Sequence, residues 1–471
     1  MLECREIYVM SDTTHTPKKT VDMEAIVSLC KRRGFIFPGS EIYGGLAGTW
    51  DYGPYGVALR NNIKNMWWSF FVDGRTDMYG VDAAILMNQN VWKSSGHVGG
   101  FNDPLVEDVK TKKRYRADHL LEDAGIDPKG MTVAEMDSVI KERKLQSPDK
   151  NPLGDVRQFN MMFATKTGAA DDDSATVYLR PETAQGMFVN FKNILDTFHP
   201  RLPFGMAQIG KAFRNEIAPG NFIFRLRELE QMEIEYFVKP DEWRKSFDEL
   251  LALQKEFLIS LGLPESKIHQ VEIPEADRAH YSKWSVDTEF DFPIGQKELL
   301  GIAYRTDFDL NAHKVGSGTD LSFFDEETKE RYVPHCVEPT FGLDRLMLAV
   351  LSSVYDEEEV EGENRVVLHF NPRVAPVQVA VLPLSKKEEL TGPAKEILKT
   401  LRQVGRVAYD ETQSIGKRYR RQDEIGTPYC VTVDFDTLTD NAVTVRDRDT
   451  MKQERVAISE LTAYIASKLE A

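Results

Sequence analysis

Apolar residues recur along the chain at two spacings, one typical of helices and one typical of strands. Leu59, Ile63 and Phe70 lie at helical spacing. The pattern ends at Asp73-Gly74, a pair that favours a turn. A short helix is predicted after Asp22, a plausible N-cap, and further helices over residues 134–144, 240–261, 342–355 and 387–404. Strands are predicted over residues 80–87, 286–292 and 299–307.

Residues 212–237 combine a strand-like pattern with a high density of opposed charge. Side chains alternate between the two faces of a strand, so residue parity sorts the second half of this predicted hairpin into two surfaces. The even surface, which ends in apolar residues, consists of Phe224, Leu226, Glu228, Glu230, Met232, Ile234 and Tyr236. The odd surface, cationic at one end and anionic at the other, consists of Arg225, Arg227, Leu229, Gln231, Glu233 and Glu235.

This segregation of charge has two explanations. The odd surface could be a solvated sheet face with cross-strand ion pairs, each worth no more than about 1 kcal/mol. Alternatively, it binds a ligand that is anionic at one end and cationic at the other, such as a nucleotide lying beside an amino acid. A similar choice applies to the glycine-rich stretch 39–56, which is either a looped strand connection or a functional loop whose backbone approaches a ligand.

Changes in composition and periodicity along the 471 residues predict two or three domains. Residues 1–21 have no clear period and are interpreted as a tail. Residues 102–158 are rich in charged residues and are interpreted as a module inserted into the main domain, which consists of residues 22–101 and 159–373. The pattern beyond Pro376 alternates strand and helix, which predicts a separate α/β domain over 374–471.

Composition narrows the class of protein. The net charge of -16 argues against bulk electrostatic coating of nucleic acid, although "GKRYRR" (416–421) is a local basic run that is either a solvated face or an RNA contact. The sequence contains no apolar run long enough to span a membrane and no secretory signal, so we expect a cytoplasmic protein. The four cysteines lack paired spacing and are expected to be reduced.

Five short stretches together resemble one enzyme family. "FRNE" (213–216) and "FGLDR" (341–345) resemble the second and third signature motifs of class II aminoacyl-tRNA synthetases. "RPETAQG" (180–186), "LEQME" (229–233) and "EPTFG" (338–342) narrow the resemblance to glycyl-tRNA synthetases of the homodimeric type. The resemblance runs from about Asp22 to the C-terminus. It implies an α+β fold with a mixed, mainly antiparallel sheet flanked by helices, an inserted module and a C-terminal anticodon-binding domain.

The chain departs from the family pattern at four places. Thr340 replaces the usual serine of "EPS" and adds a methyl group beside the expected amino-acid pocket, and Leu229 replaces a common phenylalanine. The insertion lacks the Cys-x-x-Cys of bacterial relatives, so no zinc is expected there. The first class II motif, which can only be residues 57–87, lacks its interface proline, and this weakens the prediction of a dimer.

The resemblance implies a two-step reaction in which glycine attacks the α-phosphate of ATP and then passes from the adenylate to the 3′ end of tRNA(Gly). Arg214, Glu216 and Arg345 are the implied catalytic residues, with Arg214 at the α-phosphate, Arg345 at the γ-phosphate and Mg²⁺ held by Glu298. Phe224 is expected to stack on adenine. The full set implied for ATP is Arg214, Asn215, Glu216, Phe224, Arg225, Leu226, Arg227, Glu228, Leu229, Glu298, Leu299, Gly342, Leu343, Asp344 and Arg345.

The resemblance also implies a pocket that excludes any side chain on the amino acid. Glu182, Glu233 and Glu338 match the acidic cage for the ammonium group, and Thr340 forms the wall. The full set implied for glycine is Arg116, Glu182, Leu229, Glu230, Gln231, Met232, Glu233, Glu338, Pro339, Thr340, Phe341 and Gly342. Two alternatives remain, a class II synthetase of another amino-acid specificity and a non-catalytic paralogue. The implied partners are glycine, ATP, tRNA(Gly) and a second copy of the chain.

Overall fold

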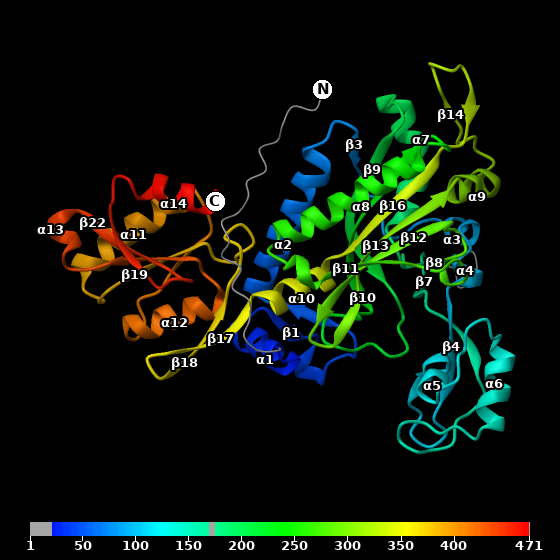
Figure 1. Cartoon of the computed structure of the whole chain (residues 1–471), viewed down its shortest axis with the longest axis horizontal. Helices are drawn as coiled ribbons and strands as arrows, with labels where there is room; N and C mark the ends of the chain where they lie inside the picture. The colour runs from blue at the N-terminus through cyan, green and yellow to red at the C-terminus, as the bar shows by residue number, and fades with distance from the viewer. Residues whose placement is uncertain (1–20, 169–174, 471) are drawn as a thin grey trace.

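The computed structural model describes residues 21–168 and 175–470, so the predicted N-terminal tail lies almost wholly outside the described residues. Figure 1 shows a central sheet with the C-terminal domain and the inserted module at opposite ends of the molecule. The chain enters through α1 (Met23–Arg33), which Asp22 caps as predicted and which ends at the left-handed Gly34. Among the described helices, none is long and apolar enough to cross a membrane.

The central sheet has seven strands in the order β11-β12-β13-β16-β10-β9-β3. Neighbouring strands are antiparallel except for β3, which runs parallel to β9. The sheet is therefore mixed and mainly antiparallel, as expected. The strands are β3 (Met78–Gly80), β9 (Phe204–Phe213), β10 (Glu228–Val238), β11 (Ile268–Glu272), β12 (Trp284–Phe292), β13 (Gly295–Thr306) and β16 (His335–Gly342).

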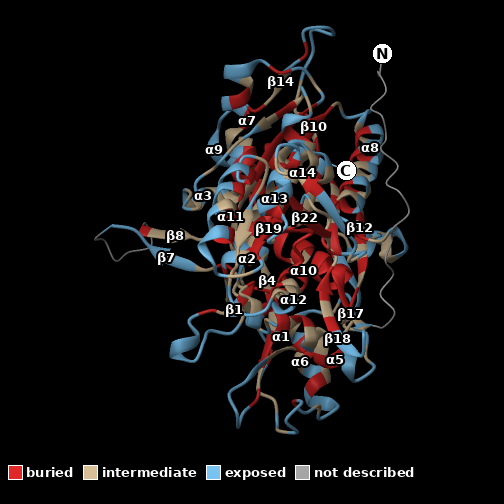
Figure 2. Cartoon of the chain, turned by 90° about the vertical axis from the view of Figure 1, so that its left-hand side faces the viewer, coloured by how far each residue is buried: buried red, intermediate tan, exposed pale blue. Residues whose placement is uncertain are grey.

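Helices cover the two faces of this sheet differently. The even side chains of β10, such as Met232 and Ile234, belong to a large core with α2 (Pro54–Trp68), α8 (Trp243–Ser260) and α10 (Leu343–Val354). Figure 2 shows α10 as buried along its length. The odd face is covered at one end by α7 (Ala184–Phe198) and α9 (Phe308–Ser317). The remainder of the odd face forms the floor of a cavity.

Two segments differ from their predicted structure. The strand predicted over residues 80–87 is wrong beyond its first residue, because β3 ends at Gly80 and the chain then leaves the sheet. The carbonyl of Ala83 accepts hydrogen bonds from the side chains of Arg180 and Gln208 instead. The acidic stretch 356–365, predicted as an interruption near the end of the helix, forms an antiparallel hairpin of β17 (Tyr355–Val360) and β18 (Glu363–Leu368). Glu361 and Gly362 both have positive φ at its two-residue turn, which is typical of hairpins.

The inserted module has its own small core between a three-stranded sheet and two helices. The strands are β4 (Asn102–Glu107), β5 (Arg114–Arg116) and β6 (Arg157–Asn160), and the helices are α5 (Ala117–Asp123) and α6 (Val133–Glu142). The helix predicted over 134–144 is therefore confirmed, with its start one residue earlier and its end two residues earlier. Strand β6 runs across the predicted boundary at residue 158, so the module joins the main domain through strands.

The C-terminal domain is a five-stranded sheet in the order β20-β19-β21-β22-β23 with helices packed on it. The predicted alternation beyond Pro376 is confirmed as β19 (Val379–Pro383), α11 (Glu388–Leu401), β20 (Val407–Tyr409), α12 (Ile415–Ile425) and β21 (Tyr429–Val433). It is followed by α13 (Thr437–Asp440), β22 (Ala442–Asp447), β23 (Gln453–Ala457) and α14 (Leu461–Glu470).

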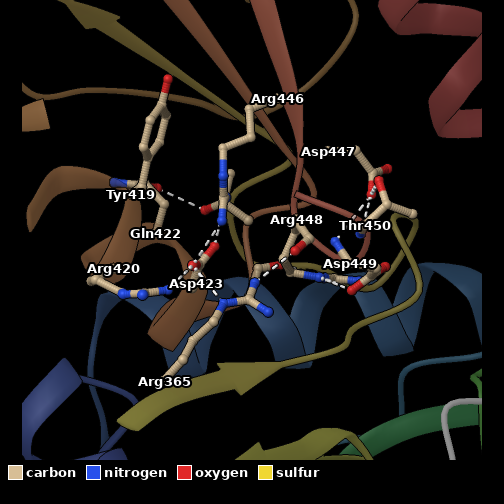
Figure 3. A network of polar contacts seen from close by, with 12 residues as sticks. Arg365, Tyr419, Arg420, Gln422, Asp423, Arg446, Asp447, Arg448, Asp449 and Thr450 are labelled. Atoms are coloured by element: carbon tan, nitrogen blue, oxygen red, sulfur yellow. Dashed lines mark hydrogen bonds and ion pairs between the residues drawn. The ribbon is translucent and has the colours of Figure 1, made fainter. Parts of the chain in front are cut away.

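A buried ionic network joins the β17–β18 hairpin to this domain (Figure 3). Asp423 of α12 is fully buried and accepts hydrogen bonds from Arg365 of β18 at 2.9 Å and from Arg446 of β22 at 2.9 Å. Arg365, also fully buried, donates a further hydrogen bond to the carbonyl of Arg448. Since buried charges need partners, these contacts couple the position of the hairpin to the C-terminal domain.

Candidate active site

A cavity of about 500 Å³ lies on the odd face of the central sheet. Its floor is built from residues that are cross-strand partners. One row consists of Glu233, Thr340, Gly301 and Asp287, and a neighbouring row contains Glu338, Ala303 and Ser285. The two central positions carry only Gly301 and Ala303, so the space above them stays open. Polar side chains therefore surround a small, flat floor.

The cationic end of the cavity contains three arginines. Among the ion pairs between described residues, none involves Arg214 or Arg225, and the Nε of Arg214 donates only to the carbonyl of Pro181, at 3.1 Å. Arg345, in the first turn of α10, lies 3.1 Å from Glu298, and its guanidinium lies 4.4 Å from the ring centroid of Phe224. The guanidinium groups of Arg214 and Arg225 are therefore available to bind an anionic group such as a phosphate.

The anionic end is formed by Glu182, Glu233 and Glu338, all buried. Glu233 accepts hydrogen bonds from the hydroxyls of Thr183 and Thr340, the latter at 2.8 Å. These donors orient the Glu233 carboxylate without neutralising it. Arginines therefore lie at one end of the cavity and buried glutamates at the other. Within β10, the odd residues Leu229, Gln231 and Glu233 line it, as their parity suggested.

Sequence reasoning missed the group that organises the anionic end, Arg305. This side chain is 1% exposed, and it forms a bidentate pair with Asp309 at 2.7 and 2.8 Å and a third contact with Glu338 at 2.8 Å. The amide of Gln185 donates to both Glu182 and Asp309, and His97 lies 3.4 Å from Glu182. The Arg305–Asp309 spacing of four residues was a weak signal, because exposed helical pairs have the same spacing.

Burial and like charge change the acidity of these carboxyls. Burial and the nearby Glu182 raise the pKa of Glu233. Burial, partly offset by Arg305 and reinforced by Glu233, raises the pKa of Glu338 to about 8. Burial would also raise the pKa of Glu182, but His97 and Arg305 outweigh it and hold that pKa well below its usual range. Clusters of perturbed carboxyls in a cavity are typical of functional sites.

Most of the residues predicted for the site line this cavity. They are Glu182, Arg214, Glu216, Phe224, Arg225, Leu226, Leu229, Gln231, Glu233, Glu298, Leu299, Glu338, Thr340, Gly342, Asp344 and Arg345. The cavity also contains residues that were not predicted, among them Asp287, Ser285, Arg278 and Tyr281. The motifs that carry the resemblance do not include these residues. Strand alternation alone does not show which face of β12 lines the cavity.

Several predicted residues lie elsewhere. Glu228 pairs with Lys211 at 2.9 Å, and Glu230 pairs with Arg60 and Lys64 on the helix-covered face of the sheet. This follows from their even numbers. Arg116 pairs with Asp103 and Asp118 in the inserted module. The other predicted residues that do not line the cavity are Asn215, Arg227, Met232, Pro339, Phe341 and Leu343.

Arg227 braces the glycine-rich loop rather than the cavity. It donates to the carbonyls of Ala47 and Glu216, while its own backbone N–H donates to the carbonyl of Gly48. Gly48 has φ +76°, and a Cβ there would lie 2.5 Å from Pro219. The loop is thus a strand connection between β1 (Ile36–Pro38) and β2 (Trp50–Tyr52), and its glycine lets the backbone approach the turn before β10.

The basic run 416–421 serves mainly to hold the C-terminal domain together. Arg418 is buried and donates to the carbonyls of Pro383 and Gln413. Arg421 pairs with Asp410, and Arg420 lies 3.8 Å from Asp423. Among the four basic residues of the run, only Lys417 is exposed. Helix α12 therefore presents fewer exposed cations to solvent than the sequence of the basic run suggested.

Two carboxylates at the cationic end could hold a divalent cation. Glu298 is half-exposed, and Asp287 lines the same cavity. Burial and the charges of Glu298 and Glu289 raise the pKa of Asp287 to about 7, as expected for carboxylates in proximity. Mg²⁺ is usually bound through one or two carboxylates together with substrate phosphates, and this donor set fits that requirement.

Comparison with known proteins agrees with this geometry. A family model described as the tRNA synthetase class II core domain (G, H, P, S and T) matches residues 163–354, and one described as the anticodon binding domain matches residues 378–468. The glycine–tRNA ligase of Geobacillus thermodenitrificans is 53% identical over 95% of this chain and 97% of its own length. That of Staphylococcus saprophyticus is 50% identical over 96% of this chain and 100% of its own length. The chain therefore belongs to the glycine–tRNA ligase family of class II aminoacyl-tRNA synthetases.

Proposed function

We propose that the protein activates glycine with ATP and transfers the glycyl group to the 3′ end of tRNA(Gly). The observation that carries this proposal is the bipolar cavity. Arg214 and Arg225, which form no ion pair with any described residue, lie at one end, and the Glu233 carboxylate lies at the other. A triphosphate and an ammonium group match these two ends. The family relationship to glycine–tRNA ligases supports the assignment.

In the first step, a carboxylate oxygen of glycine forms a bond to the α-phosphorus of ATP. The bond from that phosphorus to the bridging oxygen breaks, and pyrophosphate leaves with the electron pair. The reaction needs orientation and charge stabilisation rather than a nucleophile from the protein. The planar guanidinium of Arg214 is suited to contact both the α-phosphate and the incoming carboxylate. Bound Mg²⁺, held by Glu298 and Asp287, would neutralise charge on the phosphates.

Binding of ATP requires one local movement. Phe224 is expected to stack on adenine, yet the Arg345 guanidinium lies over its ring at 4.4 Å. No second ring fits between them at that separation, so Arg345 must leave the face of Phe224. The γ-phosphate, near the positive N-terminal end of α10, is the proposed destination of this side chain.

Selectivity for glycine is proposed to depend on the anionic end. The ammonium group binds Glu233, whose carboxylate is oriented by Thr183 and Thr340. Arg305 fixes Glu338 beside it and lies outside the cavity lining. The Thr340 methyl group narrows the space beside the α-carbon, so a substrate with a Cβ would meet a steric barrier. Such a wall can reject alanine more strongly than lost contacts would.

In the second step, a ribose hydroxyl of the terminal tRNA nucleotide attacks the carbonyl carbon of the adenylate, and AMP leaves. The C-terminal domain, residues 378–468, is proposed to bind the anticodon. We further propose that the protein acts as a homodimer in the cytoplasm. Support for the dimer comes from exposed apolar side chains at Ile42, Tyr43 and Leu46, which a second copy could cover.

Glycine-dependent exchange between ATP and pyrophosphate tests the proposal. We expect exchange with glycine, none with serine, threonine or proline, and loss of exchange in Arg214→Ala with the fold retained. Exchange with another amino acid would favour a synthetase of different specificity. Absence of exchange with any amino acid would favour a non-catalytic paralogue. The dimer is tested separately by sedimentation of wild type and Tyr43→Glu.

A further inference from the structure

Glu235, the second glutamate on the odd face of β10, lies next to Glu233 on that face and takes no part in the chemistry described above. Glu235 is fully buried and does not line the cavity. The register of β10 against β16 pairs Glu233 with Thr340 and Tyr236 with Val337, which sets Glu235 opposite Glu338. Oxygens of Glu233, Glu235 and Glu338 all lie within 4.8 Å of one another. Three carboxyl groups therefore share one small buried space.

The partners of these carboxyls differ in charge. Arg305 contacts Glu338 and Asp309, and His97 lies beside Glu182. Glu233 has two hydroxyl donors and faces the cavity, where the ammonium group would bind. Glu235 forms no ion pair with any described residue and has no access to the substrate. Among the described residues, the only hydrogen bond to Glu235 comes from the thiol of Cys336, at 3.0 Å to Oε2. Its Oε1 is buried and has no hydrogen-bond partner among these residues.

A negative charge on Glu235 would be costly. An ionised carboxylate buried without a compensating cation avoids its desolvation cost by binding a proton. The groups that face Glu235 oppose a charge there, since Glu338 and Glu233 are acidic and Arg305 is already shared by two other carboxylates. Because the Cys336 thiol occupies Oε2, the unpartnered Oε1 is where a proton would be carried.

We propose that Glu235 is a positioning residue that stays protonated at physiological pH, so that the negative charge of this cluster is confined to the carboxyls that can meet the ammonium group. The inference rests on the proposed function, because it assigns Glu233 to the substrate ammonium. It also explains how Glu235 can lie opposite Glu338, another buried carboxyl, without adding a negative charge to the cluster. A neutral Glu235 keeps the attraction for ammonium at the part of this face that lines the cavity.

Two glutamine variants test this assignment at adjacent positions of one face. Glu235→Gln replaces a neutral carboxyl with a neutral amide of similar size, whereas Glu233→Gln removes the charge that binds ammonium. We expect Glu235→Gln to raise the KM for glycine by no more than about threefold, and Glu233→Gln by more than about a hundredfold, the range for removal of one partner of a buried ion pair. Equal losses in the two variants would overturn the proposal.

The pH dependence of stability distinguishes a protonated Glu235 from a residue whose role is purely structural. Burial raises the pKa of Glu235, so the folded protein retains a proton that the unfolded chain releases above the ordinary carboxyl pKa of about 4.3. Wild type then loses stability relative to Glu235→Gln as pH rises above about 5, so its melting temperature falls relative to that of the variant. The exposed Glu326→Gln serves as a control, whose melting temperature should differ from that of wild type by a constant amount. A constant difference for Glu235→Gln would contradict the proposal.

Infrared spectroscopy and metal analysis of the same proteins complete the test. The infrared spectrum of wild type minus Glu235→Gln at neutral pH should contain the carbonyl band of a protonated carboxyl group. Metal analysis of the purified protein should find no cation that Glu235→Gln removes. A stoichiometric metal lost in that variant would overturn the proposal, since the cluster would then be neutralised by a cation. If wild type lacks glycine-dependent exchange, the proposed function fails, and the infrared and stability results still decide whether Glu235 is protonated.

Discussion

Substitution of Arg305 by methionine should destabilise the protein strongly, because it removes the cation that two buried carboxyls share. Asp309 and Glu338 are 2% and 6% exposed. The pKa of Glu338 is already raised to about 8, so this group can remain protonated near pH 7 at little cost. Asp309 is left buried without its cation, and removal of one partner from a buried ion pair costs about 3–5 kcal/mol.

Lys192→Met is the matched control. Lys192 also pairs with an aspartate four residues along the chain, Asp196, but both side chains are about half-exposed. Loss of this pair should cost less than about 0.5 kcal/mol. The assay is urea unfolding followed by tryptophan fluorescence, comparing the first cooperative transition of the two variants at pH 7. Similar losses in the two variants at pH 7 would refute the reasoning.

Three further predictions concern the cavity. Thr340→Gly should increase exchange with alanine relative to glycine by about tenfold, the scale of one methyl contact, and unchanged selectivity would place the wall elsewhere. Gly301→Ala should fold normally, since the added Cβ would lie 3.7 Å from its nearest neighbour, Oδ1 of Asp287. It should nevertheless raise the KM for ATP or glycine by about tenfold by filling the floor, whereas Gly392→Ala, at an exposed position of α11, should not. The KM for glycine should fall as pH rises from about 6.5 toward 8, because Glu338, with its pKa of about 8, ionises and attracts the ammonium group; a KM that is constant over this range would contradict that role.

Much of the site could be predicted because strand alternation is rigid. The odd residues Gln231, Glu233 and Glu235 share one face of β10, and the even residues Met232 and Ile234 pack in the helical core, as parity requires. Parity could not be extended to residues 224–227, because β10 begins at Glu228. The chain before it forms a turn with positive φ at Asn221 and Phe222, and this resets the alternation.

Other features depend on contacts that sequence spacing does not encode. Arg305 contacts Glu338 from an irregularity in the β13–β16 register between Tyr304 and Thr306. No pattern in the sequence predicts that shift of register. The basic run 416–421 looked like an exposed cation cluster, yet three of its arginines contact carbonyl or carboxylate groups of the same domain. Charge composition shows that cations are present, but only the fold shows whether they are already paired.

The central claim is that one cavity binds the triphosphate by arginines and the amino group of glycine by Glu233. A crystal structure with a non-hydrolysable glycyl-adenylate analogue tests it most directly. The account predicts density with the ammonium group in hydrogen-bond contact with Glu233, the phosphate beside Arg214 and adenine against Phe224. Density for the analogue outside this cavity, or an amino group directed away from Glu233, would contradict it.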